Sequence, residues 1–274
     1  DNQCNKLFTF MEEKNKTLNI YETAKNKSYH QHFWEVLVGN TLAEAELDIK
    51  KDCRDAAPDF FFEIDGMKIH IEAKAPTEGM IEDLKPKGIK VYDASELLKD
   101  DSFELGFITG EKSILRLTSI LSATIKQIET SFVKHGTVKQ NDKIIIAING
   151  NDVVKNKEIH KDNFNYGITS YGFHMLCALY GLSGNEFLDP KTNKYYYAQE
   201  PLYKGKVPIV GQFFCPNNKT PIDGIIYSNV NMRTYLQNAQ PFLFFPNPEK
   251  EDLGHYFPFC KNVGCPIKFD NNIE

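Results

Sequence analysis

Hydrophobic and polar residues alternate in two short runs, over residues 60–64 and 67–74, which an Asp65-Gly66 pair separates. Asp-Gly between two apolar-rich runs is a strong hairpin signal, because a two-residue type I′ turn needs positive φ at both central positions. Such a turn fixes the register of the two strands. The pattern therefore predicts an antiparallel hairpin over 60–74, and extending its register by one pair places Asp59 opposite Glu72.

Side chains of this hairpin divide between two faces, since paired residues of antiparallel strands point to the same side. The apolar face carries Phe60, Phe62, Ile64, Met67, Ile69 and Ile71. The polar face carries Asp59, Phe61, Glu63, Lys68, His70 and Glu72, and Lys74 follows with the same parity. Two neighbouring carboxylates beside an ammonium group suit a divalent cation and a water molecule, because Mg²⁺ prefers oxygen ligands and keeps several waters.

A simpler interpretation of the polar face is an amphipathic hairpin with its charges in solvent. Glu63 and Lys68 then form an ordinary cross-strand ion pair. The bare string Pro-Asp followed by an acid, any residue and Lys is short, and it also arises by chance. The register favours a functional site, because the turn brings Asp59 beside Glu72 and the string alone does not require this.

Asp59, Glu72 and Lys74 resemble the PD-(D/E)xK motif of the restriction-endonuclease-like phosphodiesterase superfamily. The resemblance implies a mixed sheet flanked by helices, with the motif on a central hairpin. It also implies metal ligation by Asp59, Glu72 and the backbone carbonyl of Ala73, and a role for Lys74 in orienting or activating the attacking water. An upstream helix of the family often supplies another acid. Glu35 is the candidate, and a solvated residue on the helix flank is its alternative interpretation.

Helical spacing predicts that upstream helix. Ser28 with Gln31 three residues later is a capping-box signature. Apolar residues then repeat at helical spacing through about Ala45: Phe33, Trp34, Leu37, Val38 and Leu42. A second stripe predicts a helix that begins at Ser113 and stops at Gly136.

An unbroken apolar run, Lys143–Asn149, is typical of a central strand buried on both faces. Beyond it the pattern predicts a helix over about 168–181 and strands over 208–215, 222–228 and 241–246. The expected fold is α/β: a mixed central β-sheet flanked by helices, with a restriction-endonuclease-like core and a C-terminal extension of the sheet.

The expected organisation is a single nuclease-like domain over 1–274, because no Gly/Ser or Pro-rich linker divides the chain. Residues 1–27 form a peripheral segment, and residues 28–150 form the core with the motif. Residues 151–274 then supply the completing helices and strands.

Two further residues are candidates for contact with a substrate. His70 shares the face of Glu72 and has the chemistry of a base or of a hydrogen-bond donor to phosphate, while stacking on Phe61 is the simpler role. Gln127 stands on the polar side of the second helix, where family members often direct a polar residue to the site. A solvated helix face is the alternative interpretation of Gln127.

Charge and composition limit the partners. The net charge is −5 and the chain has only three arginines, which argues against a dense arginine-based readout of bases. No apolar run approaches the roughly 18 residues of a membrane span, so no membrane partner is expected. The six scattered cysteines are typical of a reduced, cytoplasmic protein. Cys260 and Cys265 form only a weak zinc candidate, because a second Cys or His pair is missing nearby.

The predicted function is a metal-dependent nuclease that uses Mg²⁺ or Mn²⁺ and acts on nucleic acid, with DNA favoured over RNA. By analogy with double-strand cutters of this family, a homodimer is one expected arrangement. One alternative is a catalytically silent member of the same fold that binds nucleic acid, a nucleotide or a protein. Another is a different fold, in which the hairpin is surface decoration on an interaction protein.

Overall fold

The protein is described from a computed structural model. It describes residues 29–51, 56–76, 105–151, 153, 170–180, 182–189, 194–199, 202–204, 207–209, 213–214, 219–230 and 242–263. The chain forms two compact units. The first unit comprises Asp1–Ala75, Ile125–Asn151 and Pro221–Glu274, and the second comprises Pro76–Thr124 and Asp152–Thr220. The predicted motif lies wholly in the first unit, while the expectation of a single domain stays a prediction.

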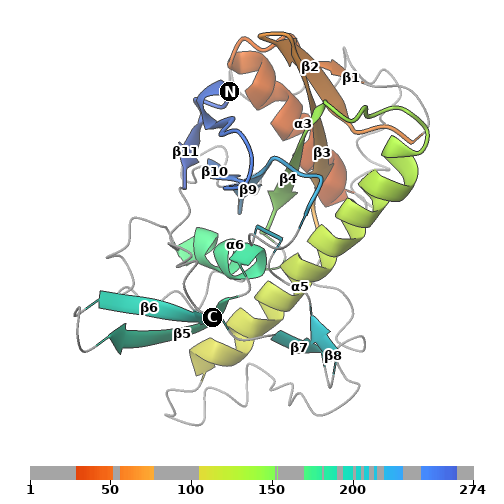
Figure 1. The fold of residues 1–274 in the computed structure, drawn as a ribbon. Coiled ribbons are helices and arrows are strands. Elements are labelled where there is room, and N and C mark those ends of the chain that lie inside the picture. The colour runs from red at the N-terminus through yellow and green to blue at the C-terminus, as the bar shows by residue number, and fades with distance from the viewer. Residues whose placement is uncertain are drawn as a thin grey trace. The chain divides into compact units, whose positions relative to one another are not determined.

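A seven-stranded mixed sheet forms the first unit (Figure 1). In spatial order its strands are β1 (Lys50–Lys51), β2 (Phe60–Ile64), β3 (Met67–Lys74), β4 (Lys143–Asn149), β9 (Gly224–Ser228), β10 (Phe242–Pro246) and β11 (Cys260–Asn262). The central strands β3, β4 and β9 are parallel, whereas β2 is antiparallel to both β1 and β3. The predicted α/β class and the C-terminal extension of the sheet are confirmed.

The hairpin of β2 and β3 has the predicted register. Phe60 pairs with Ile71 and Phe62 with Ile69. The turn residues Asp65 and Gly66 have φ angles of 50° and 76°, as a type I′ turn requires. Because β3 lies between β2 and β4 inside the sheet, the hairpin is part of the sheet and not surface decoration.

Helix α3 (Tyr29–Glu44) packs on one face of this sheet. The Trp34 indole is fully buried, donates its Nε1 hydrogen to the Ala147 carbonyl at 2.9 Å and stacks on the Phe242 ring. The core on this side comprises Phe33, Trp34, Val36, Leu37, Val38, Leu42, Phe60, Phe62, Ile69, Ile71, Ala73, Ile145, Ala147, Ile226, Val230, Phe244, Leu253 and Phe257. The predicted helical stripe and the apolar face of the hairpin therefore meet in one core.

The opposite face of β3 is also covered, which the sequence pattern did not indicate. His70 is 0% exposed and Glu72 is 3% exposed. Ile146 and Ile148 of β4 have the same parity and are buried too. His70 and Glu72 of β3 therefore lie in the protein interior. Electrostatic interactions are stronger there than in water.

Helix α5 (Leu105–Gln127) begins well before the predicted start at Ser113. The Ser113 hydroxyl does not cap a helix but donates to the Val153 carbonyl at 2.9 Å. A π-helical segment, η2 (Ile128–Val133), continues the helix, and Gly136 with φ of 68° follows at the predicted stop.

The second unit contains further elements that the pattern predicted only in part. Described there are α6 (Ser170–Tyr180), β5 (Leu182–Asp189), β6 (Lys194–Gln199), β7 (Leu202–Lys204) and β8 (Val207–Ile209). The helix expected over 168–181 is thus confirmed. Of the strand expected over 208–215, residues 208 and 209 belong to β8, while residues 210–212 and 215 lie outside the described residues. The prediction is wrong at 213–214, which lie in a turn, and the Phe214 amide there donates to the Leu179 carbonyl.

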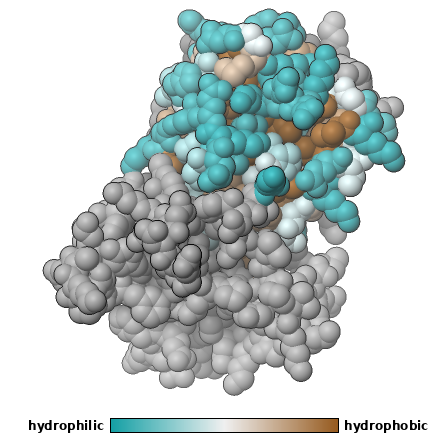
Figure 2. All heavy atoms as spheres, viewed as in Figure 1, coloured by the Kyte–Doolittle hydropathy of each residue, from teal (hydrophilic) through white to brown (hydrophobic). Residues whose placement is uncertain are grey.

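Surface residues of the described part are mainly hydrophilic on the face shown in Figure 2, with hydrophobic residues visible between them. Among the large hydrophobic residues in the described part of the chain, Val133 alone is clearly exposed, with 47% of its surface accessible to solvent. No helix in the described part of the chain combines the length and the apolar character needed to cross a bilayer.

Gly150, which follows β4, is expected to tolerate no side chain. Its amide donates to the Ser228 carbonyl at 2.8 Å, and a Cβ atom there would collide with the Tyr227 hydroxyl and lie 2.5 Å from Asn229 Oδ1. We expect Gly150→Ala to lower the free energy of unfolding by about 1–3 kcal/mol, the usual cost of overpacking a buried position. Urea unfolding beside the exposed-site control Gln140→Ala measures this, and equal midpoints for both variants would contradict the packing described.

Candidate functional site

Asp59 stands just before β2 and binds the neighbouring strand through its side chain. Asp59 Oδ2 accepts the Ala73 amide hydrogen at 2.8 Å. The backbone pairing of β2 with β3 ends at Phe60 and Ile71. Beyond that pair, the Ala73 amide bonds to the Asp59 side chain instead of to a backbone carbonyl of β2. This bond fixes the Asp59 carboxylate beside the Glu72-Ala73 peptide.

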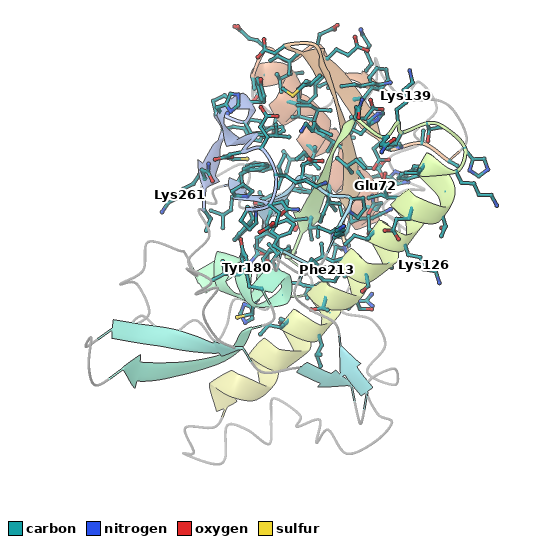
Figure 3. The ribbon with its side chains drawn as sticks, in the orientation of Figure 1. Glu72, Lys126, Lys139, Tyr180, Phe213 and Lys261 are labelled. Atoms are coloured by element: carbon teal, nitrogen blue, oxygen red, sulfur yellow. The ribbon has the colours of Figure 1, made fainter. Side chains whose placement is uncertain are left out.

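Glu72 and Lys74 lie on the same face of β3, two residues apart. Lys74 Nζ is 2.5 Å from Glu72 Oε1. Glu72 lies within the side chains around the sheet, whereas Lys126 and Lys139 reach outward (Figure 3). Glu72 Oε2 is buried and has no hydrogen-bond partner among the described residues. The Lys74 side chain keeps 27% of its surface exposed, so this ion pair connects a buried carboxylate with solvent.

Glu35 reaches the same region from α3, together with Gln31 one turn earlier. Gln31 Nε2 donates to Glu35 Oε1 and to the Ala73 carbonyl, at 2.7 Å each. Gln31 Oε1 accepts the Ala75 amide hydrogen at 2.8 Å. The side chain of Gln31 thus forms hydrogen bonds with β3 and the residue that follows it.

The role predicted for Gln31 is a capping box with Ser28, and the structure gives its side chain other partners. Ser28 itself lies outside the described residues. The sequence signal for the observed bond to Glu35 is that Gln31 lies one helical turn before it. The spacing of Gln31 from Ser28 points instead to a helix cap.

Two acids of the site, Asp59 and Glu72, have raised pKa values. The pKa of Asp59 rises from its ordinary value of 3.8 to about 7, mainly because the group is buried and then because Glu72 and Glu35 lie nearby. The pKa of Glu72 is also raised by burial, and Lys74 partly offsets this rise. A positive charge beside Asp59 and Glu72 would favour their ionised forms and so lower both pKa values.

The donor set fits a hard divalent cation in its chemistry. It consists of the carboxylates of Asp59, Glu72 and Glu35 with the Ala73 carbonyl, and one buried oxygen, Glu72 Oε2, lacks any partner among the described residues. Within the described part of the chain, however, no three His, Cys, Asp or Glu side chains are already grouped as they would be around a metal ion. Lys74 contacts Glu72 Oε1, and Gln31 donates to Glu35 Oε1 and to the Ala73 carbonyl, so three oxygens of the set have partners within the protein.

His70 lies deeper than the substrate role predicted for it requires. Its Nε2 is 3.0 Å from Asp142 Oδ2, and that same oxygen accepts the Lys139 amide hydrogen. The Phe61 ring is 6.0 Å away and tilted by 41°, which agrees with the simpler contact role. His70 therefore connects β3 with the turn before β4, and its contact with a substrate stays a prediction.

Gln127 ends α5 and is half-buried, and among the described residues it forms no hydrogen bond with the acidic groups. Its predicted role therefore stays a prediction. Cys260 begins β11, and burial raises the pKa of its thiol, which disfavours the thiolate that zinc would need. Cys265 lies outside the described residues.

Compared with protein-family models, with curated proteins and with solved structures, the chain has no match. Function therefore has to be argued from the site itself.

Proposed function

We propose that the protein is a metal-dependent nuclease that hydrolyses phosphodiester bonds of DNA or RNA. The observation that carries the proposal is the meeting of Asp59, Glu72 and Lys74 at the carboxyl end of the hairpin, with Glu35 brought in from α3. The proposal is supported by the interactions among these charged groups: Lys74 pairs with Glu72, and the charges of Glu72 and Glu35 both raise the pKa of Asp59.

Each residue of the proposed site has a role set by its position. Asp59, Glu72, Glu35 and the Ala73 carbonyl would hold Mg²⁺ or Mn²⁺, which when bound supplies an activated water and polarises a phosphoryl oxygen. Lys74 is partly exposed and positively charged. Its ammonium group would orient the attacking water and offset the negative charge that develops on the phosphate.

The order of elements supports a restriction-endonuclease-like core. A helix, α3, precedes the hairpin of β2 and β3, and α5 leads to β4, which lies beside β3 in parallel. This order agrees with a mixed sheet, flanked by helices, that has the motif on a central hairpin. Fold alone does not imply activity, so the weight of the proposal rests on the acidic site.

A nucleic acid is the proposed partner, with DNA favoured over RNA. The net charge of −5 argues against a tight sequence-independent grip on phosphates, so binding in the absence of specific contacts is expected to be weak. We propose a homodimer only for the case in which both strands of a duplex are cut.

A catalytically silent member of the same fold, binding nucleic acid, a nucleotide or a protein, is the second candidate. It is favoured by the ion pair of Lys74 with Glu72 and by the lack of a ready-made metal group among the described residues. Such a protein has no need to bind Mg²⁺ or Mn²⁺. Metal affinity therefore separates the two candidates.

The test is a cleavage assay on circular single-stranded DNA, supercoiled double-stranded DNA and RNA, in Mg²⁺, in Mn²⁺ and in EDTA. We expect cleavage with either metal, none in EDTA, and none with Asp59→Asn, which keeps an acceptor for the Ala73 amide and loses the charge. Asp48→Asn removes an exposed carboxylate elsewhere and is the matched control. No cleavage under any condition, with no Mn²⁺ binding, would support the silent scaffold.

A further inference from the structure

The Gln31 amide lies between two oxygens of the proposed metal site. Its Nε2 is 2.7 Å from Glu35 Oε1 and 2.7 Å from the Ala73 carbonyl. An amide nitrogen has two hydrogens, and here both point to oxygens that a divalent cation would use. The third bond, from the Ala75 amide to Gln31 Oε1, fixes the orientation of the side-chain amide, because only its oxygen can accept.

We infer that Gln31 occupies part of the cation site in the metal-free protein and competes with the cation for Glu35 and the Ala73 carbonyl. This inference rests on the proposed function and names a residue that the motif does not include. A cation binds carboxylate and carbonyl oxygens directly, so it and the Gln31 hydrogens cannot both take the same lone pairs.

The same contacts account for the position of Glu35. One of its oxygens is bound by Gln31, and the other is 3.8 Å from His32 Nδ1. Glu35 is near enough to raise the pKa of Asp59, yet its side chain is bound by residues of its own helix. Loading a cation would therefore require Gln31 to release Glu35, and the energy of these hydrogen bonds is subtracted from the affinity.

Gln31→Met tests the inference, because methionine is of similar length and neutral but has no donor. We expect Gln31→Met to bind Mn²⁺ about tenfold more tightly than the wild type at pH 7.5, since two hydrogen bonds to the ligand oxygens no longer have to be broken. Isothermal titration of the metal-free full chain with Mn²⁺ measures this. Thr41→Val is the matched control, because it removes a hydroxyl that donates within α3, to the Leu37 carbonyl.

Thermal unfolding with and without Mn²⁺ adds a readout that a purely structural role would not change. If Gln31 only supports the fold, Gln31→Met lowers the melting temperature equally in both conditions. If it competes with the cation, the metal-free form is destabilised and Mn²⁺ raises the melting temperature by more than in the wild type. Gln31→Leu, which is also neutral and has no donor, replaces Gln31→Met should the latter fail to fold.

The outcomes separate the inference from the proposed function. Tighter Mn²⁺ binding by Gln31→Met than by the wild type supports the inference. Measurable binding by the variant alone, with none by the wild type, supports it too. Equal or weaker binding by the variant, with a wild type that binds Mn²⁺, overturns the inference and leaves the proposed function standing. Absence of Mn²⁺ binding in both proteins overturns both.

Discussion

Lys74→Met is expected to reduce metal-dependent cleavage by about 10²–10³-fold, the usual cost of removing one preorganised donor from a developing negative charge. Methionine keeps most of the aliphatic stem of lysine and removes only the ammonium group. Lys74 is the positive charge nearest to Glu72 among the described residues, and its partial exposure lets it reach a bound substrate. The rate of nicking of supercoiled DNA at saturating Mg²⁺ measures the effect.

Glu72→Gln is expected to be at least as damaging, because it removes a proposed cation ligand and the partner of Lys74 together. The double variant should be about as slow as the slower single variant, since residues that act as one unit are not additive. The control is Lys68→Met. Lys68 is on the same hairpin, but its Nζ lies 4.0 Å from the Phe61 ring and not at the acidic site.

Both variants are expected to stay folded. Removing Lys74 leaves Glu72 buried without its ion pair, and the carboxyl group then takes up a proton instead of keeping an unpaired charge. Circular dichroism spectra like that of the wild type are the expected result. Wild-type cleavage rates in Lys74→Met or in Glu72→Gln would refute the proposed catalytic roles.

Local sequence signals are sufficient to predict the hairpin. The Asp65-Gly66 turn needs positive φ at both residues, and alternation on either side leaves one register that buries the apolar face. A shift by one residue would have moved Phe62 and Ile69, which are buried in the core here, to the face that carries Glu63 and Lys68. For the same reason the turn and the alternation are enough to place Asp59 beside Glu72.

Tertiary contacts decide what the sequence pattern cannot. Glu72 and His70 are buried because other elements cover a face whose composition is polar, and no local periodicity reports that. Gln31 contacts residues of β3 far along the chain, so its role as a bridge from α3 cannot be distinguished by local spacing from a helix cap. Strand β1 has only two residues, too few for an alternating pattern.

Stability of the metal-free protein is expected to fall as the pH rises from about 4 to about 7. Asp59 has a pKa of about 7 when folded and 3.8 when unfolded, so in this range the folded state binds the extra proton. Ionising Asp59 at higher pH then costs folding energy, with an upper limit of about 4 kcal/mol at pH 7.5. Below about pH 3 the group is protonated in both states, and it no longer affects the balance.

Asp59→Asn isolates this contribution, because the amide is of the same size and does not titrate. In EDTA at pH 7.5 the variant should be more stable than the wild type towards urea, and at about pH 3 this pH-dependent difference should vanish. Other buried acids, such as Asp223, contribute to the pH dependence of both proteins, so only the difference between them is assigned to Asp59.

Mg²⁺ or Mn²⁺ should restore the lost stability in the wild type and not in Asp59→Asn. A cation at one hundred times its dissociation constant adds about 2.7 kcal/mol to a folded state that alone binds it. Because the cation replaces a proton on Asp59, this gain should increase as the pH rises towards 7 and level off above it. Equal pH dependence and equal metal stabilisation in both proteins would show that Asp59 neither titrates near 7 nor binds the cation. Burial and the neighbouring carboxylates disfavour the charged form of Asp59 in the metal-free protein. A bound cation favours that charged form, so the same site is expected to lower the stability without metal and to gain stability when metal binds.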